Sequence, residues 1–189
     1  MVLARTIHVF IKLIPVILAL RKDRILWISQ EGKNIDEKRF RRNAQRVLNT
    51  CISLGPVFIK FGQWLSSRAD ILPQPYLEEL SKLQDSVPAV PFEKVRPIIE
   101  EDIGNIKEKF DDLDQNSLSG ASLGQVHLAT KNGQKVIVKV KRPGIEKQVE
   151  KDLKVLMKII PFAMKFVDPN LRFSIIPIMK QFVDSIHEE

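Results

Sequence analysis

The chain has 189 residues and a mass of 21.7 kDa, is 44% apolar and 28% charged, and contains 8 glycines and 11 prolines. This composition is that of a globular protein with one domain, or one domain and an extension, and it excludes disordered, collagen-like and disulfide-rich classes. The single cysteine, Cys51, cannot form an internal disulfide, which indicates a reducing compartment.

The net charge of +7 is concentrated near the N-terminus. Residues 1–50 contain 11 basic and 4 acidic side chains, whereas the remaining residues contain 19 of each. Such a local excess indicates an anionic partner (a membrane surface, a nucleic acid or a protein) or only solvated helix surfaces. We expect no nucleic-acid partner, because few aromatic residues lie among the arginines and no reading motif is present.

The most apolar stretch runs from Ile7 to Leu20. As a helix its 14 residues extend about 21 Å, whereas a hydrocarbon core is roughly 30 Å thick, so we predict that it does not cross a membrane. A signal peptide is disfavoured because no small-residue cleavage pattern follows Leu20. Arg21, Lys22 and Arg24 come next. Two interpretations remain, a helix at a membrane interface or against a partner, and a helix buried in its own protein.

Helical periodicity continues to about residue 104. Apolar residues recur on one helical face from Phe40 to Ile52. Gly55-Pro56 ends this helix and begins a second, which we expect to reach about Asp70. A third helix is predicted to begin at Pro75, and a fourth to end at about Ile103.

The pattern changes after Gly104. Two short runs, 125–129 and 135–140, flank Asn132-Gly133, a strong signal for a β-hairpin turn. Helical periodicity resumes at Ile145, with predicted breaks near Pro161 and Asp168. The predicted fold class is therefore α+β, with helices, a small antiparallel sheet and further helices.

The predicted hairpin carries one candidate site. The loop 119–124 is rich in small residues, so its backbone N–H groups could approach phosphate oxygens. Lys139 alternates with Val138 and Val140 on the return strand and therefore points to the opposite face from them. A loop over phosphates with a lysine on a nearby strand is the arrangement of a kinase N-lobe. Taken alone, Lys139 is equally an ordinary lysine on an exposed strand face.

The second predicted helix carries another candidate. Lys60, Gln63 and Ser67 share one helical face. Gly62 costs about 1 kcal/mol of helix propensity relative to alanine, which indicates close approach by another backbone or a ligand. The spacing alone also fits an ordinary amphipathic helix with a packing glycine. The three histidines and Cys51 have no metal-ligand spacing, so we expect no metal site.

Five segments in order resemble the UbiB family of atypical kinase-like proteins, also called aarF-domain kinases. The segment 54–63 resembles the family's Lys-x-Gly-Gln helix, and 67–73 and 79–85 resemble the segments that follow it. Ala121-Ser122-Leu123-Gly124-Gln125-Val126-His127 resembles its nucleotide loop, and 138–144 resembles its nucleotide-lysine strand. The resemblance covers roughly residues 40–189.

The resemblance implies a kinase-like N-lobe preceded by a helical extension. The expected segments are an apolar and basic helix at 1–34, the Lys-x-Gly-Gln extension at 35–104, and a partial N-lobe with insertion helices at 105–189. Lys139 would contact the phosphates of ATP or ADP, with Lys60, Gly62 and Gln63 against the nucleotide site. The nucleotide-binding loop would be formed by Gly120, Ala121, Ser122, Gly124 and Gln125.

The same resemblance implies the physiology of the family. Its members support isoprenoid-quinone biosynthesis and lipid handling, often at membranes, with quinone or lipid precursors as partners. We therefore expect a cytoplasmic protein peripheral to the inner face of the membrane. The alternative is a non-catalytic membrane-peripheral or protein-interaction module.

Two departures from the family pattern matter. The loop reads Ser119-Gly120-Ala121 where three alanines are usual, which puts nucleotide preference in doubt. No His-Arg-Asp or Asp-Phe-Gly occurs in these 189 residues, so the catalytic-loop and metal-binding aspartates are not among them. Glu189 lies where the family's glutamate partner of the strand lysine begins, with Glu188 as the alternative register. We expect Mg²⁺ only with a C-lobe, and a C-lobe chain as a candidate partner.

Overall fold

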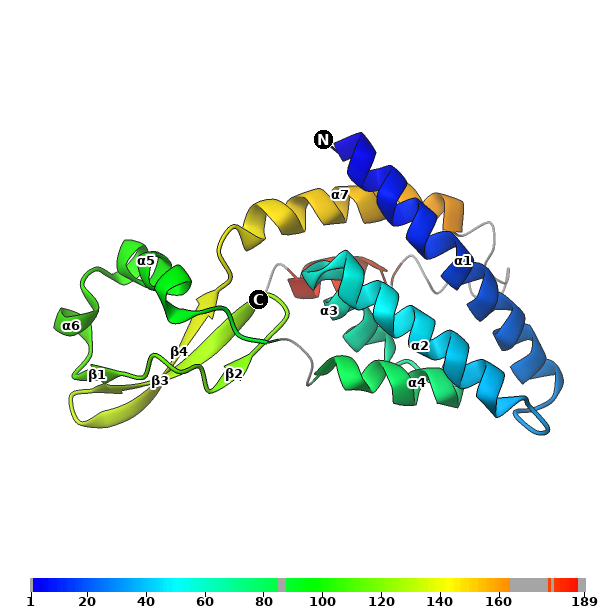
Figure 1. The fold of residues 1–189 in the computed structure, drawn as a ribbon, viewed down its shortest axis with the longest axis horizontal. Helices are drawn as coiled ribbons and strands as arrows, with labels where there is room; N and C mark the ends of the chain where they lie inside the picture. The colour runs from blue at the N-terminus through cyan, green and yellow to red at the C-terminus, as the bar shows by residue number, and fades with distance from the viewer. Residues whose placement is uncertain (1, 85–87, 164–176, 178, 187–189) are drawn as a thin grey trace. The chain divides into compact units, whose positions relative to one another are not determined.

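A computed structural model describes residues 2–84, 88–163, 177 and 179–186 (Figure 1). The chain forms two compact units. The helical unit comprises Met1–Leu83 and Val149–Glu189, and the sheet unit comprises Gln84–Gln148. The combination of helices with a small antiparallel sheet confirms the α+β prediction.

The helical unit contains α1 (Val2–Ser29), α2 (Glu37–Leu54), α3 (Pro56–Leu65), α4 (Gln74–Ser81) and most of α7 (Ile145–Ala163). A short 3-10 helix, η1 (Lys82–Gln84), follows α4. The core of the helical unit includes Phe40, Leu54, Phe58, Tyr76, Leu80 and Leu83, each at most 1% exposed. The predicted inward face is confirmed from Phe40 to Cys51, whereas Ile52, which was predicted on the same face, is 46% exposed.

Helix α1 corrects the prediction made for the N-terminal segment. The helix has 28 residues rather than 14, because the charged stretch after Leu20 continues it to Ser29. Within the described residues, Leu3–Ser29 is the one helix whose length and composition would allow it to cross a membrane. The argument that the segment is too short is therefore wrong.

A buried carboxylate joins α1 to the neighbouring helices. Asp23 is fully buried and accepts hydrogen bonds from Asn43 Nδ2 and the Tyr76 hydroxyl, both at 2.9 Å. Arg39 Nη2 forms an ion pair with its other oxygen at 2.7 Å. Burial, together with the hydrogen bond to Asp23, raises the pKa of Tyr76 above its usual value. A buried charge requires such partners, so this cluster fixes the end of α1 against α2 and α4.

The second helix is shorter than predicted. Helix α3 ends at Leu65 rather than near Asp70, and the Ser66 hydroxyl donates to the Gln63 carbonyl at 2.6 Å. Serine competes for backbone groups in this way, which favours helix ends. Gly55, with φ of 99°, separates α2 from α3 as the sequence predicted.

The sheet unit has β3 (Gly124–Lys131) at its centre. Strand β4 (Gln134–Lys141) pairs with one edge of β3, and β1 (Asp112–Leu113) and β2 (Ser119–Gly120) pair with the other, all antiparallel. Asn132 and Gly133 both have positive φ, 51° and 72°, as a two-residue hairpin requires. The predicted hairpin is confirmed, whereas β1 and β2 were not anticipated.

One face of this sheet is covered. Helix α5 (Phe92–Ile103) packs Val95 and Ile99 against Val140 of β4, and the four-residue α6 (Ile106–Lys109) adds Ile106 (Figure 1). Helix α5, assigned from the sequence to the segment 35–104, thus belongs to the unit that holds the sheet, because its apolar face has the sheet as its partner.

The burial of Cys51 predicts that its thiol reacts slowly in the folded chain. Desolvation raises the pKa of the thiol from 9.0 to about 12. We expect alkylation by a maleimide at pH 7.5 to be at least 100-fold slower in the folded chain than in urea, because both thiolate and access are lacking. Since the unfolded state ionises first, stability should fall as the pH rises from about 9 towards 12. Mass spectrometry of timed samples checks the rate, and fast labelling of the folded chain would contradict it.

Candidate nucleotide site

The face of the sheet that points away from α5 carries Lys139, and no described residue of the sheet unit covers it. In the register of the three strands, Ser119 of β2, Val126 of β3 and Lys139 of β4 lie opposite one another in one row. Residues in one row point to the same side of a sheet. Val140, the next residue after Lys139, is buried against α5, so Lys139 points away from that helix and is exposed. The lysine therefore stands on the open face beside a valine and the strand that leads into the small-residue loop.

The small-residue loop joins β2 to β3. Ala121 N donates to the Gly124 carbonyl at 2.9 Å, so the loop turns back on itself. A Cβ on Gly124 would lie 2.7 Å from the Val140 carbonyl oxygen. Glycine is thus required there by the approach of β4, whatever else the loop binds. Ser122 is buried, whereas Gly120 and Ala121 are partly exposed.

Arg142 holds this loop and was not singled out from the sequence. Its Nε donates to the Ala121 carbonyl at 3.1 Å and its Nη2 to the Pro88 carbonyl at 2.8 Å. Its backbone N–H donates to the Leu123 carbonyl at 3.0 Å. Partial burial lowers the pKa of Arg142 from its usual value. The position of Arg142 directly after β4, the strand that carries Lys139, was the sequence signal that could have identified it. Nothing in the neighbouring sequence showed that its side chain turns back to the loop.

Gln125 and His127 form a buried polar chain under the loop. The Gln125 amide pairs with the backbone of Val90, accepting from its N–H at 2.7 Å and donating to its carbonyl at 3.0 Å. His127 Nδ1 lies 2.8 Å from the Asp114 carbonyl, and Nε2 lies 2.8 Å from Gln125 Nε2. A carbonyl only accepts, so Nδ1 carries the proton and Nε2 accepts from the amide. These hydrogen bonds occupy the Gln125 side chain, so only the backbone of Gln125 could contact a nucleotide.

The Lys-x-Gly-Gln segment lies on α3 in the helical unit. Gln63 Nε2 donates to the Leu83 carbonyl at 2.9 Å. A Cβ on Gly62 would clash with Leu83 Cδ1 and lie 3.2 Å from Cys51 Sγ. The groups that approach Gly62 are therefore side chains, and not the other backbone that the sequence suggested. Gly62 and Gln63 together hold Leu83, and Lys60 is partly exposed.

Other predicted features are placed as follows. Glu189 lies outside the described residues. Within the described ranges, no group of three His, Cys, Asp or Glu side chains could hold a metal ion.

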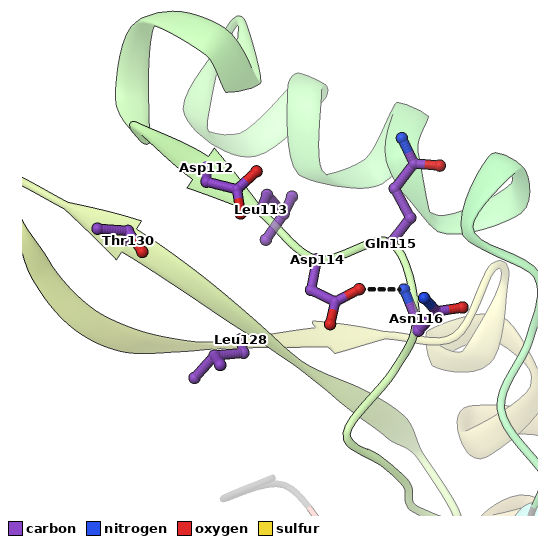
Figure 2. Close-up of a pocket in the computed structure, with 7 residues that line it drawn as sticks. All are labelled: Asp112, Leu113, Asp114, Gln115, Asn116, Leu128 and Thr130. Atoms are coloured by element: carbon purple, nitrogen blue, oxygen red, sulfur yellow. Dashed lines mark hydrogen bonds between the residues drawn. The ribbon is translucent and has the colours of Figure 1, made fainter.

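A cavity of about 430 Å³ opens at the β1 end of the sheet unit. Figure 2 shows its lining residues, which include Asp112, Asp114 and Asn116 beside Leu128 and Thr130 of β3. The Asp114 carboxylate accepts from the Asn116 backbone N–H at 2.8 Å. None of the predicted nucleotide residues lines this cavity, and its two carboxylates disfavour phosphate.

The sequence of this chain is similar to those of known proteins. Residues 82–189 match the family described as the ABC1 atypical kinase-like domain. The chain is 43% identical over 138 residues to a "Probable protein kinase UbiB" of Marinobacter nauticus, covering 72% of this chain and 25% of the relative. It is 43% identical over 146 residues to the chloroplastic "Protein ACTIVITY OF BC1 COMPLEX KINASE 8" of Arabidopsis thaliana, covering 75% and 19%.

A solved structure also shows some similarity. The complex of Rv3197 with erythromycin from Mycobacterium tuberculosis has 28% identity and a TM-score of 0.39, covering 64% of this chain and 32% of that one. The chain thus spans a quarter or less of the length of the two curated relatives named above. The resemblance stated from the sequence motifs is confirmed.

Proposed function

Because the chain belongs to the ABC1 atypical kinase-like family, we propose that its sheet unit binds the phosphates of ATP or ADP on the open face beside Lys139. The observation that carries the proposal is the row Ser119, Val126 and Lys139, which sets an exposed ammonium group beside the turned loop. The ammonium would neutralise phosphate charge. Backbone groups of Gly120, Ala121, Ser122, Gly124 and Gln125 would approach the phosphates.

The activity of the complete protein is a further part of the proposal. We infer an ATPase or kinase that acts in isoprenoid-quinone biosynthesis, on quinone or lipid precursors, in the cytoplasm at the inner face of the membrane. A C-lobe would supply Mg²⁺ binding and catalysis, from the same polypeptide or a partner chain. The names of the UbiB relatives support the kinase class.

Replacing Lys139 tests the nucleotide site. We expect Lys139→Met to weaken ATP and ADP binding at least tenfold in titration calorimetry without Mg²⁺, because the phosphates lose their cation. Lys135→Met is the matched control, since Lys135 is also exposed and faces the same side of β4 four residues away. Its affinity should stay within twofold of the unchanged chain. Equal affinities of the two variants, at equal melting temperatures, would contradict the site.

A second proposed role is membrane-peripheral placement, supported by a different observation. Half of the exposed large hydrophobic residues in the described part of the chain lie on α1, namely Leu3, Ile7, Ile11, Ile25 and Ile28. Contiguous exposed apolar surface of this kind marks an interaction site. Co-sedimentation with anionic liposomes tests this role, and a chain that stays in the supernatant would refute it.

A further inference from the structure

The apolar residues of α1 form a stripe on its outer side. Leu3, Ile7 and Ile11 follow at intervals of four, and Ile25 lies 18 residues, or five turns, beyond Ile7. They are between 51% and 74% exposed. The inner side of the same helix buries Val9 and Asp23. The outer side of α1 is thus apolar, and it has no cover within the described residues.

Three sets of polar contacts, made by Arg5, Lys12 and Asp23 and called clasps below, attach α1 along its length to the rest of the helical unit. Near its start, Arg5 donates from two nitrogens to the Asp152 carboxylate of α7, at 2.9 and 3.0 Å. In the middle, Lys12 Nζ donates to the Ser53 hydroxyl of α2 at 2.9 Å. Near its end, the buried Asp23 binds three partners on α2 and α4.

These clasps oppose a membrane-spanning orientation. A span from Leu3 to Leu20 would place Lys12 near the bilayer centre, where a charged side chain is costly. Leaving the unit would also strip the buried carboxylates of Asp23 and Asp152 of their partners. A helix that lies flat keeps all three clasps and still buries the outer stripe.

Basic side chains on α1 and α2 indicate an anionic partner. Arg39 and Ser53 of α2 both reach α1, and Arg46 lies midway between them at seven-residue spacing, on the same face of α2. Arg46 and Arg42 on α2, with Arg21 and Lys22 on α1, are exposed. An apolar stripe bordered by arginine and lysine is the pattern of helices that lie in the interface of an anionic bilayer.

We propose that α1 docks flat on an anionic lipid bilayer through Leu3, Ile7, Ile11 and Ile25, with its axis in the membrane plane and both of its ends on one side. This inference rests on the membrane-peripheral role proposed above and adds its surface and orientation. Arg42 and Arg46 bind the headgroups next to the stripe.

The first experiment tests the surface by flotation of the full chain with preformed vesicles of phosphatidylcholine alone or with 30% phosphatidylglycerol. Ile7→Asp/Ile11→Asp should lower the vesicle-bound fraction at least tenfold. Ile52→Asp/Met157→Asp adds the same two charges at residues 46% and 58% exposed on α2 and α7, and should leave binding within twofold. Arg42→Gln/Arg46→Gln should weaken binding only when phosphatidylglycerol is present. Full binding by the α1 variant would overturn the proposal.

The second experiment tests the orientation. His8→Cys and Ser29→Cys place exposed thiols about 31 Å apart along α1, and Cys51 is buried. In the flat orientation, a membrane-impermeant maleimide added outside the vesicles labels both positions. Labelling of only one position before detergent is added would show a spanning helix, which overturns the flat orientation while the membrane role stands.

Two other outcomes are also decisive. If the unchanged chain does not float with either vesicle, the membrane-peripheral role itself fails, and this inference fails with it. If Ile7→Asp/Ile11→Asp converts a dimer to a monomer in sedimentation velocity without changing vesicle binding, the stripe covers a second copy of the chain, and the proposal is overturned.

Discussion

Replacing Arg5 by alanine is expected to lower the free energy of unfolding of the helical unit by about 3–5 kcal/mol. The Asp152 side chain is 1% exposed and accepts two hydrogen bonds from the Arg5 guanidinium. The Leu54 carbonyl at the end of α2 also accepts from Arg5. Without the arginine, a buried carboxylate is left with no partner for its charge. Urea denaturation followed by circular dichroism at 222 nm measures the change.

Two further variants make this result interpretable. Lys12→Ala removes an exposed hydrogen bond from the same helix and should cost at most about 0.5 kcal/mol. Arg5→Met/Asp152→Leu replaces both charges by apolar groups and should recover most of the loss, since an apolar pair is a good substitute for a buried ion pair. A double variant as unstable as Arg5→Ala would show that the arginine acts mainly through packing on Phe58, whose ring centroid is 5.8 Å away.

Replacing Gly124 by alanine is expected to destabilise the sheet unit by about 1–3 kcal/mol, the usual cost of overpacking. The added methyl group would meet the Val140 carbonyl, a backbone atom that cannot move without shifting β4. Because Lys139 lies on that strand and Gly124 closes the loop, ATP affinity should fall at least fivefold as well. Thermal unfolding and titration calorimetry on the same sample measure both effects.

Gly133 provides the matched control. An added methyl group there meets nothing within 4 Å, but φ is +72°, so alanine is strained at the hairpin turn. Gly133→Ala should therefore lower stability by about 1–2 kcal/mol and leave ATP affinity unchanged. If both variants weaken ATP binding equally, affinity follows overall stability, and the loop has no special part in it.

The hairpin shows where sequence reasoning succeeds. Its turn needs two residues with positive φ, and Asn132-Gly133 is the pair that meets this need most readily. Alternation along β4 then places Lys139 opposite the valines that face α5. Both inferences are local, so neither required knowledge of distant segments.

The loop shows where the same reasoning reached only part of the answer. Small residues indicated an approach of backbone to phosphate, whereas the structure supplies protein partners for much of this segment. Gly124 accommodates Val140, Gln125 binds Val90, and Arg142 binds Ala121. Composition reveals that a close approach occurs but not which group approaches.

The sequence by itself determined the fold class, most helix boundaries, the hairpin and the family, because each depends on residues within a few turns or on motifs in order. The tertiary structure decided the extent and attachment of α1. Asp23 finds its partners 20 and 53 residues away, and Arg5 finds Asp152 at a separation of 147. A helix can end at a charged residue, or it can continue with that residue buried among partners from other helices. Which of the two occurs depends on distant partners, and periodicity within one segment carries no information about them.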